Sequence, residues 1–596
     1  MLDMNKATAA YNFISLPECI LPSGIEQAPG DTPKEKYKTF IKAQGKISGY
    51  ISLTLTARTP LFIGSRITGS DDGREQLFFS PDGRPVIPGS TIRGMTKNLF
   101  KIITCGTLRT TQDDADVADT TLYFRTMAGN DSSVRKLYTK RNPMKRVPDE
   151  KGVDSADSAS EPGFLVRTVD GSYYMCPTTK RLMRDLPAKI ETNSASVEWD
   201  KPAKHEVTCY TGKMKNKAHY TIHEECTFTP ADRKKVLPDI VEAYKNDITR
   251  CNGNPDSAID IFKTHNFHKE GDAARDFTGE NDIVFVAPCF YLTDDDGEVE
   301  SFGFGRFYRL PYNHSIGDHI PEALRDKDDE RIDYADALFG RKELWGSRLA
   351  FEDATTDNAE QLPAAFPKPL ATPKPTSFQL YLEQKHRLKN WDDLDVKLRG
   401  YKLYWHQHDG YNWKEDQGEE NNDKINPYRI RPVKAGTVFK GRIRFENLAK
   451  EELGALLKVF ALASTKEHDI CFKLGKAKSC GLGSVKAEAR LIRTDEKKSY
   501  SNLFSSNGSW ETAEHEDDSV PYIKAFDKAR KERIPTGDYN RIMNELLVML
   551  DFGQTKKADW EKRTRTMTID KDETDKQRKP FKHRLILQTP LEVVEE

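Results

Sequence analysis

Three stretches of the chain have the residue pattern of β-strands, with apolar and polar side chains recurring on opposite faces. They cover residues 48–57, 283–292 and 438–448. Residues 451–464 carry apolar side chains at helical spacing instead, and they begin with two acidic residues that suit the positive end of a helix dipole. The pattern therefore predicts a fold that mixes strands and helices.

The segment 85–104 predicts a short strand followed directly by a helix. The strand ends at Pro88–Gly89, and either Ser90 or Thr91 can cap the helix that follows. Arg93 and Lys97 lie four residues apart, on the same side of that helix. A helix N-terminus with adjacent cations suits the phosphate groups of a nucleic acid backbone. The alternative is an ordinary capped helix with two solvated basic residues.

A second segment with candidate binding chemistry is the glycine-rich stretch 473–484. Its glycines permit positive φ and a close approach of the backbone, and its lysines supply positive charge. These residues are Gly475, Gly481 and Gly483 with Lys473, Lys476 and Lys478. The stretch is not a phosphate-binding P-loop, because its glycines precede a strand and its lysines lie at the wrong positions. A plain hairpin turn is the alternative.

Taken together and in this order, five segments resemble the RAMP superfamily of CRISPR-associated proteins, especially the backbone subunits of type III effector complexes. The segments are residues 59–65, 85–95, 336–340, 346–354 and 474–486. The resemblance implies an α+β fold with a ferredoxin-like, RRM-type core. It also implies three kinds of partner in antiviral defence: CRISPR RNA, target RNA and other type III effector subunits.

The motif order predicts one RAMP core interrupted by a large inserted domain. Only one helix-start segment and one glycine-rich segment are present, which disfavours a tandem pair of cores. Polar runs between the two segments indicate an insertion. The expected divisions are an N-terminal extension (1–45), the first part of the core (46–104), the insertion (105–280), the second part of the core (281–490) with a thumb in 355–435, and a C-terminal extension (491–596).

Some subunits that this chain resembles also cut target RNA with a loop aspartate and a divalent cation such as Mg²⁺. The corresponding loop offers Asp71 and Asp72, which could hold a metal against the scissile phosphate. An Asp-Asp-Gly turn without catalysis is the alternative. A different class of function is a CRISPR RNA-processing endoribonuclease that uses His406 or His408 as a general base. A third is a scaffold that contacts other subunits only.

Two further groups of residues carry weaker expectations. Cys209, His219, His223 and Cys226 have side chains that can bind zinc, but their spacing departs from that of zinc fingers. Six cations within residues 135–146 form either a solvated face or a nucleic-acid contact in the insertion.

Composition limits the classes of function without selecting one. The 596 residues contain 92 Lys and Arg against 93 Asp and Glu, a balance that excludes a uniformly basic nucleic-acid binder but allows a local basic face. The nine scattered cysteines suggest reduced thiols and a cytoplasmic protein. No stretch approaches the roughly 20 apolar residues that span a bilayer, so no membrane partner is expected.

Overall fold

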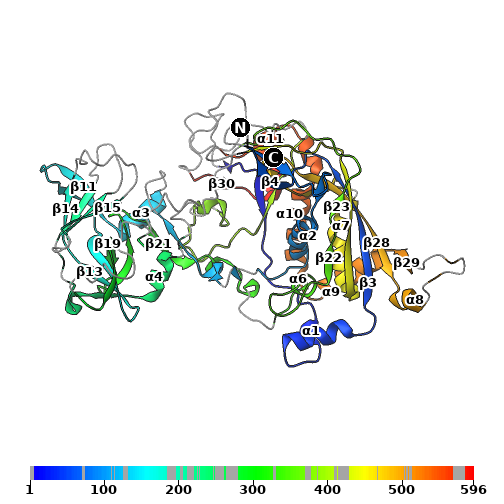
Figure 1. The fold of residues 1–596 in the computed structure, drawn as a ribbon, viewed down its shortest axis with the longest axis horizontal. Coiled ribbons are helices and arrows are strands. Elements are labelled where there is room, and N and C mark those ends of the chain that lie inside the picture. The colour runs from blue at the N-terminus through cyan, green and yellow to red at the C-terminus, as the bar shows by residue number, and fades with distance from the viewer. Residues whose placement is uncertain are drawn as a thin grey trace.

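The computed structural model shows two bodies joined by extended segments (Figure 1). The main body contains both ends of the sequence, and the second body is built from its middle. The structure describes residues 6–595 except 70–73, 109–110, 113–114, 125–131, 184–195, 202–205, 211–219, 225, 227, 246, 248–260, 263–279, 326–330, 369–376, 386, 409–412, 414–427, 466, 502–503, 505–507, 509–512 and 568–583.

The main body is organised around an antiparallel sheet with β3 at its centre. In spatial order the principal strands are β28 (Ser484–Thr494), β3 (Ile47–Ala57), β26 (Val438–Leu448), and the short β22 (Leu349–Phe351) and β23 (Ala354–Thr355). Alternate residues of β3, such as Ile51, Leu53 and Leu55, are buried against the core. The strands predicted at 48–57 and 438–448 are thus confirmed, and they pair with each other.

Shorter strands extend this sheet at both edges. They are β6 (Val86–Ile87), β27 (Phe472–Lys473) and β29 (Glu514–Asp517). β6 pairs with β23, whereas β27 and β29 both pair with β28. A separate group places β5 (Glu75–Phe78) between β4 (Gly64–Thr68) and β25 (Arg429–Ile430).

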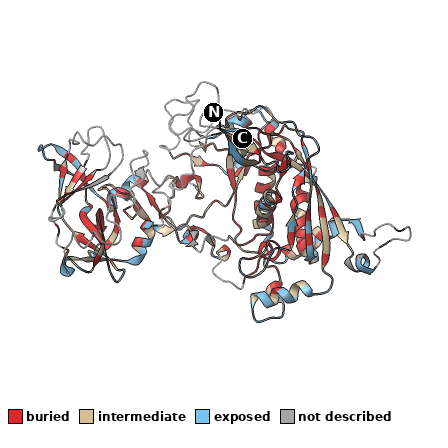
Figure 2. Ribbon diagram, in the orientation of Figure 1, coloured by how far each residue is buried: buried red, intermediate tan, exposed pale blue. Residues whose placement is uncertain are grey.

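Two helices, α2 (Gly89–Ile103) and α7 (Lys450–Ala461), cover one face of the main sheet, with buried residues between the layers (Figure 2). The C-terminal helix α9 (Val520–Lys531) packs on α7, beside α10 (Thr536–Leu550). Gly454 makes the contact with α9 close, because a Cβ there would lie 2.0 Å from the carbonyl oxygen of Tyr522. The C-terminal segment is therefore part of the core of the main body.

The N-terminal segment is also tied into the main body. After the strands β1 (Lys6–Ala7) and β2 (Tyr11–Ile14), it forms the helix α1 (Pro33–Lys42). β2 pairs with β24 (Tyr401–Tyr404), and β1 pairs in parallel with β30 (Ile586–Leu587). The short helix α12 (Pro590–Glu595) follows β30. Within the described part of 355–435, residues 360–365 run antiparallel to residues 430–434, and Ala365 and Ile430 exchange backbone hydrogen bonds at 3.1 and 2.9 Å. The thumb expected in 355–435 stays a prediction, because residues 369–376 and 414–427 lie outside the described residues.

The second body contains a five-stranded antiparallel sheet in the order β18–β13–β12–β19–β20 and a four-stranded sheet in the order β14–β17–β16–β15. Its elements are β9 (Thr121–Phe124), α3 (Ser132–Arg141), β10 (Met144–Pro148), β11 (Asp154–Ser158), β12 (Glu161–Thr168), β13 (Tyr173–Pro177), β14 (Lys180–Met183), β15 (Ser196–Lys201), β16 (Glu206–Tyr210), β17 (Tyr220–His223), β18 (Lys234–Val236), α4 (Pro238–Lys245), β19 (Ile283–Thr293), β20 (Val299–Gly303) and β21 (Leu310–Ser315).

The position of β19 corrects one expectation. The strand predicted at 283–292 exists, but it pairs with β12 of the second body and not with the main sheet. Its apolar residues are buried almost continuously, in the core cluster that contains Phe164 and Val286. An alternation of apolar side chains identifies a strand, but it does not indicate which sheet the strand joins. The expectation from sequence was therefore that β19 belongs to the second part of the RAMP core.

Candidate nucleic-acid interface

The N-terminus of α2 is held by a carboxylate from the segment that follows β22. The backbone N–H of Gly89 donates to Oδ1 of Asp353 at 2.7 Å. A Cβ on Gly89 would lie 2.0 Å from the carbonyl oxygen of Phe351, so only glycine fits this contact. The N-cap residue is Pro88, whose own side chain makes no capping hydrogen bond. The expected cap at Ser90 or Thr91 is therefore wrong, because the helix begins earlier and Asp353 takes one of its free N–H groups.

Arg93 and Lys97 lie on the same side of α2, as their spacing predicts. Both side chains lie near the ring of Phe339, at 5.6 Å for the Arg93 guanidinium and 5.9 Å for the Lys97 ammonium. Arg93 Nη2 also donates to the carbonyl oxygen of Phe339 at 2.9 Å. Burial lowers the pKa of Lys97, and the neighbouring Lys101 and Arg93 lower it further. Arg93 and Lys97 of α2 thus contact the C-terminal end of the helix α6 (Tyr334–Phe339).

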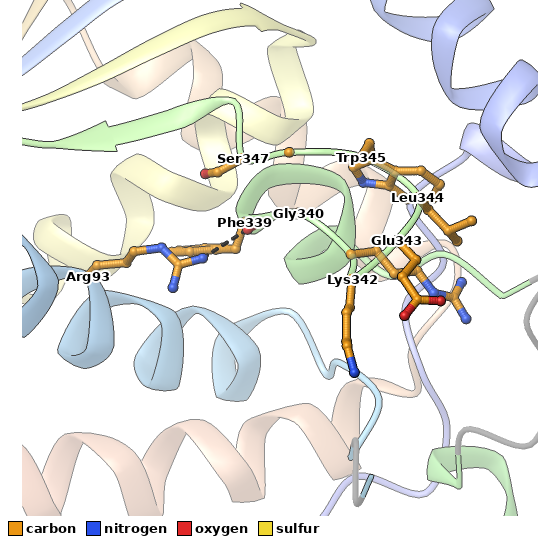
Figure 3. Close-up of a pocket in the computed structure, with 10 residues that line it drawn as sticks. Arg93, Phe339, Gly340, Lys342, Glu343, Leu344, Trp345 and Ser347 are labelled. Carbon is orange, nitrogen blue, oxygen red and sulfur yellow. Dashed lines mark hydrogen bonds between the residues drawn. The ribbon is translucent and has the colours of Figure 1, made fainter. Parts of the chain in front are cut away.

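A shallow pocket of about 580 Å³ lies between Arg93 and the loop that follows α6 (Figure 3). The loop reverses direction with positive φ at Gly340 and Glu343. Its Trp345 stacks on Tyr37 of α1 with ring centroids 4.3 Å apart. No motif in the sequence indicated this pocket. The available signal was a basic and aromatic loop, residues 340–347, placed between two of the motif segments.

The glycine-rich segment adopts the backbone that its composition predicts. Gly475, Gly481 and Gly483 all have positive φ. A Cβ on Gly475 would lie 2.3 Å from the carbonyl oxygen of Phe62, and the N–H of Gly483 donates to the carbonyl oxygen of Pro60 at 2.9 Å. The glycine-rich segment therefore interlocks with residues 59–65. These two motif segments are about 400 positions apart in the sequence.

The three lysines of this loop lie in three different environments. Lys473 is only partly exposed, and its ammonium donates to the carbonyl oxygens of Gly481 and Leu482 at 3.2 and 3.0 Å. Burial lowers the pKa of Lys473 to about 7. Lys478 is half-buried, and burial lowers its pKa as well. Lys476 is exposed, with its ammonium 2.9 Å from Oε1 of Gln76. Lys473 thus stabilises the loop, whereas Lys476 faces solvent.

Further contacts join the glycine-rich loop to the β4–β5 hairpin near the Ala57 end of β3, where Val485 pairs with Ala57. Gln76, in β5, accepts from Lys476 and donates to the carbonyl oxygen of Ser65 at 2.9 Å. The N–H of Phe79 donates to the carbonyl oxygen of Ile63, and β6 then leads directly into α2. The helix start and the glycine-rich loop are therefore linked through the β4–β5 hairpin.

The proposed cleavage residues Asp71 and Asp72 lie outside the described residues. The strands on either side of them are described, and β4 and β5 pair as a hairpin with Thr68 opposite Glu75. The segment that contains both aspartates therefore connects the two strands of this hairpin. Glu75 forms an ion pair with Arg431 at 3.0 Å.

The zinc candidates do not form a metal site among the residues that the structure places. His219 lies outside the described residues. Cys209, His223 and Cys226 are buried, and no group of three or more His, Cys, Asp or Glu side chains within the described ranges could hold a metal. The Cys226 thiol donates to the carbonyl oxygen of Pro177 at 3.2 Å. The His223 ring packs edge-on against Phe164 and Phe290, and burial lowers its pKa to about 3.

The two histidines considered as a general base differ in accessibility. His406 is 1% exposed, and its Nε2–H donates to the carbonyl oxygen of Cys471 at 3.0 Å. Its Nδ1 is 2.8 Å from the hydroxyl oxygen of Ser484 and accepts from it. Burial holds the pKa of His406 well below its usual value. A neutral ring enclosed in this way stabilises the core and cannot reach a substrate, whereas His408 is exposed.

The fold defines an α+β protein with the basic helix α2 on one face of an antiparallel sheet and the glycine-rich loop at the Ala57 end of that sheet. Residues 54–275 match the family model of the RAMP superfamily, which confirms the resemblance drawn from the motifs for this part of the chain. The matched segment begins in β3, contains α2 and extends into the second body. No curated protein matches the chain.

A likeness to a solved structure was also found. It is a chain of the Type III-B Cmr-beta bound to cognate target RNA, solved by cryo-electron microscopy. The two chains are 9% identical, the match covers 74% of this chain and 98% of the other, and the TM-score is 0.17. A likeness of this quality does not establish a common fold. Among the described residues, no helix is long and apolar enough to cross a membrane.

Proposed function

We propose that this chain is a CRISPR RNA-binding backbone subunit of a type III CRISPR-Cas effector complex and that it holds guide and target RNA. The observation that carries the proposal is a glycine-rich loop that interlocks with residues 59–65 and exposes Lys476, in a chain of which residues 54–275 match the RAMP superfamily. Backbone N–H groups and cations at a helix start suit phosphates without reading bases. Base pairing with the guide would then supply the sequence specificity.

The main body is, in this proposal, a ferredoxin-like core of the RRM type. Its support is the strand order β28–β3–β26–β22, in which neighbours are antiparallel. The chain passes from β3 through α2 to β22, and from β26 through α7 to β28. Two such units, each a strand, a helix and a strand, interleave in one sheet in that fold.

Lys97 and Lys476 are the residues that we expect to contact guide phosphates, together with Ser90, which is exposed near the start of α2. Arg93 contributes charge but also holds the carbonyl oxygen of Phe339, so its replacement would disturb α6. The test is to purify the full chain from cells that carry a CRISPR array and to sequence the RNA that it retains. Guide-length RNA is expected with the wild type, and less with the Lys97→Gln/Lys476→Gln variant.

A control variant removes the same number of cations from another part of the main body. Lys524 and Lys528 lie exposed on α9, so a Lys524→Gln/Lys528→Gln variant loses the same charge. Equal RNA retention by both double variants would contradict the assignment of the interface. Cleavage of precursor repeat RNA by the purified chain in EDTA would instead indicate a processing endoribonuclease, with His408 as its exposed histidine.

Cleavage of target RNA is a further part of the proposal. Asp71 and Asp72 would hold a divalent cation such as Mg²⁺, which would stabilise negative charge at the scissile phosphate. The 2′-hydroxyl of the target attacks the adjacent phosphorus and loses its proton, and the bond from phosphorus to the 5′-oxygen breaks. The products are a 2′,3′-cyclic phosphate and a 5′-hydroxyl, so the reaction needs no oxidant and no protein nucleophile.

A further inference from the structure

One corner of the second body presents a group of exposed cations that the interface above does not use. α3 contributes Arg135, Lys136 and Lys140, and β10, which begins three residues after α3 ends, contributes Lys145 and Arg146. All five side chains are exposed, and none forms an ion pair with a carboxylate in the described part of the chain. We call these five residues the α3–β10 surface.

The absence of ion pairs distinguishes the α3–β10 surface from three basic residues of the main body. Arg442 and Arg444 share Glu352 as an ion-pair partner, and Lys434 pairs with Glu360. Acidic residues are as frequent as basic ones in the whole chain. A concentration of positive charge without partners raises the local potential and attracts a polyanion.

The helix that carries this charge is fixed from its opposite side. Tyr138 is buried, and its hydroxyl donates to the carbonyl oxygen of Tyr308 at 2.9 Å. Asn142, also buried, donates to the carbonyl oxygen of Arg306 at 3.3 Å. Arg141, the remaining cation of α3 in this region, forms an ion pair with Glu300. The exposed cations therefore project from a fixed element, so little conformational entropy is lost when they bind a ligand.

Positive charge also exceeds negative charge beneath β10. Asp157 of β11 is buried, with Lys180 Nζ at 3.1 Å and Arg306 Nε at 4.0 Å. Arg306 Nη1 is buried without a hydrogen-bond partner, and Lys145 lies opposite Asp157 in the strand register. Burial lowers the pKa of Lys180, and Arg306 and Lys145 lower it further, whereas Asp157 raises it. One carboxylate thus faces two half-buried cations and one exposed cation, so the local charge is positive and favours binding of an anion.

We propose that the α3–β10 surface binds the sugar–phosphate backbone of RNA, independently of sequence, as a second contact apart from α2 and the glycine-rich loop. This inference rests on the proposed function, which supplies RNA as the partner. Neither α3 nor β10 exposes an aromatic ring on which a base could stack, so the contact is with phosphates. Protein–protein interfaces depend on aromatic and apolar side chains that become buried in the complex. Among the large apolar side chains of α3 and β10, Met144 is exposed, so the surface is better suited to a polyanion than to a protein partner.

The test measures binding of a fluorescein-labelled oligouridine RNA to the full chain by anisotropy over a series of salt concentrations. The variant is Lys136→Gln/Lys140→Gln/Lys145→Gln, and the matched control is Lys524→Gln/Lys528→Gln/Lys531→Gln on α9, where all three lysines are exposed. Each lost phosphate contact reduces the slope of log K against log salt by about 0.7 for a single strand, so the variant should lose about two units of slope. The control should match the wild type.

The outcomes separate this inference from the proposed function. An unchanged slope in the α3–β10 variant, with binding lost in Lys97→Gln/Lys476→Gln, would overturn the inference and leave the proposed function standing. A reduced slope in the α3–β10 variant, with the Lys97→Gln/Lys476→Gln variant unchanged, would support the inference and contradict the interface on the main body. An unchanged slope in both variants would overturn the inference and contradict the interface on the main body.

Discussion

The α-carbon of Gly89 lies against the carbonyl oxygen of Phe351, so closely that a Cβ on Gly89 would be 2.0 Å from that oxygen. The two residues are separated by more than 250 positions, and the whole second body lies between them in the sequence. Their contact, together with the hydrogen bond from Gly89 N–H to Asp353, sets the start of α2 against the edge of the main sheet. A glycine at the start of a helix is thus explained by a neighbour far along the chain.

Replacing this glycine should destabilise the main body. Gly89→Ala forces the backbone of Phe351 to move, and overpacking of this kind lowers the free energy of unfolding by about 1–3 kcal/mol. Gly94→Ala is the matched control, because Gly94 lies in the same helix with nothing within 4 Å of its added Cβ. Alanine there should stabilise the helix by about 0.5–1 kcal/mol. Thermal unfolding measures both, and a shift in the same direction for both would contradict the contact.

The stability contributed at Lys473 should depend on pH. Its pKa is about 7 in the folded chain, against a usual value of about 10.4 for lysine. Between these values the unfolded chain binds more protons than the folded chain, so the free energy of unfolding rises with pH, by at most about 1.4 kcal/mol per unit. The wild type should therefore gain stability relative to Lys473→Met as pH increases from neutrality. Lys476→Met, in the same loop but exposed, is the control, and an identical pH profile for the two variants would refute the prediction.

His406 should be required for the stability of the folded chain and not for catalysis. His406→Ala leaves the Ser484 hydroxyl and the Cys471 carbonyl without their partner and opens a cavity, which should lower the free energy of unfolding by about 2–5 kcal/mol. His408→Ala changes an exposed side chain and should unfold as the wild type does. Chemical denaturation compares them. A fully stable His406→Ala variant would show that the ring does not hold the core.

Target cleavage, if this subunit performs it, should depend on the β4–β5 connection. In the assembled complex, Asp71→Ala/Asp72→Ala should abolish one cleavage position and leave target binding intact, and EDTA should have the same effect on cleavage. Gel analysis of end-labelled target RNA measures both properties. Persistence of every cut in the double variant would assign the cleavage to neighbouring subunits.

Some features of this chain follow from local sequence because their causes are local. The positive φ of Gly475, Gly481 and Gly483 is available to glycine alone at low energy, so the loop could be predicted from composition. The strands at 48–57 and 438–448 follow from the alternation of side chains across a pleated sheet. The shared face of Arg93 and Lys97 follows from helical spacing.

The tertiary structure decided the features that depend on distant neighbours. β19 has the pattern of a strand, but its pairing with β12 depends on which edge lies beside it. Lys473 and Lys476 are three residues apart, yet one is held by carbonyl oxygens within its own loop and the other faces solvent, because the fold encloses one side of that loop. The burial of His406 depends on the strands packed around it. Sequence periodicity reports which side of an element is apolar, whereas desolvation, and with it the chemical role of a side chain, is set by the segments that pack against that element.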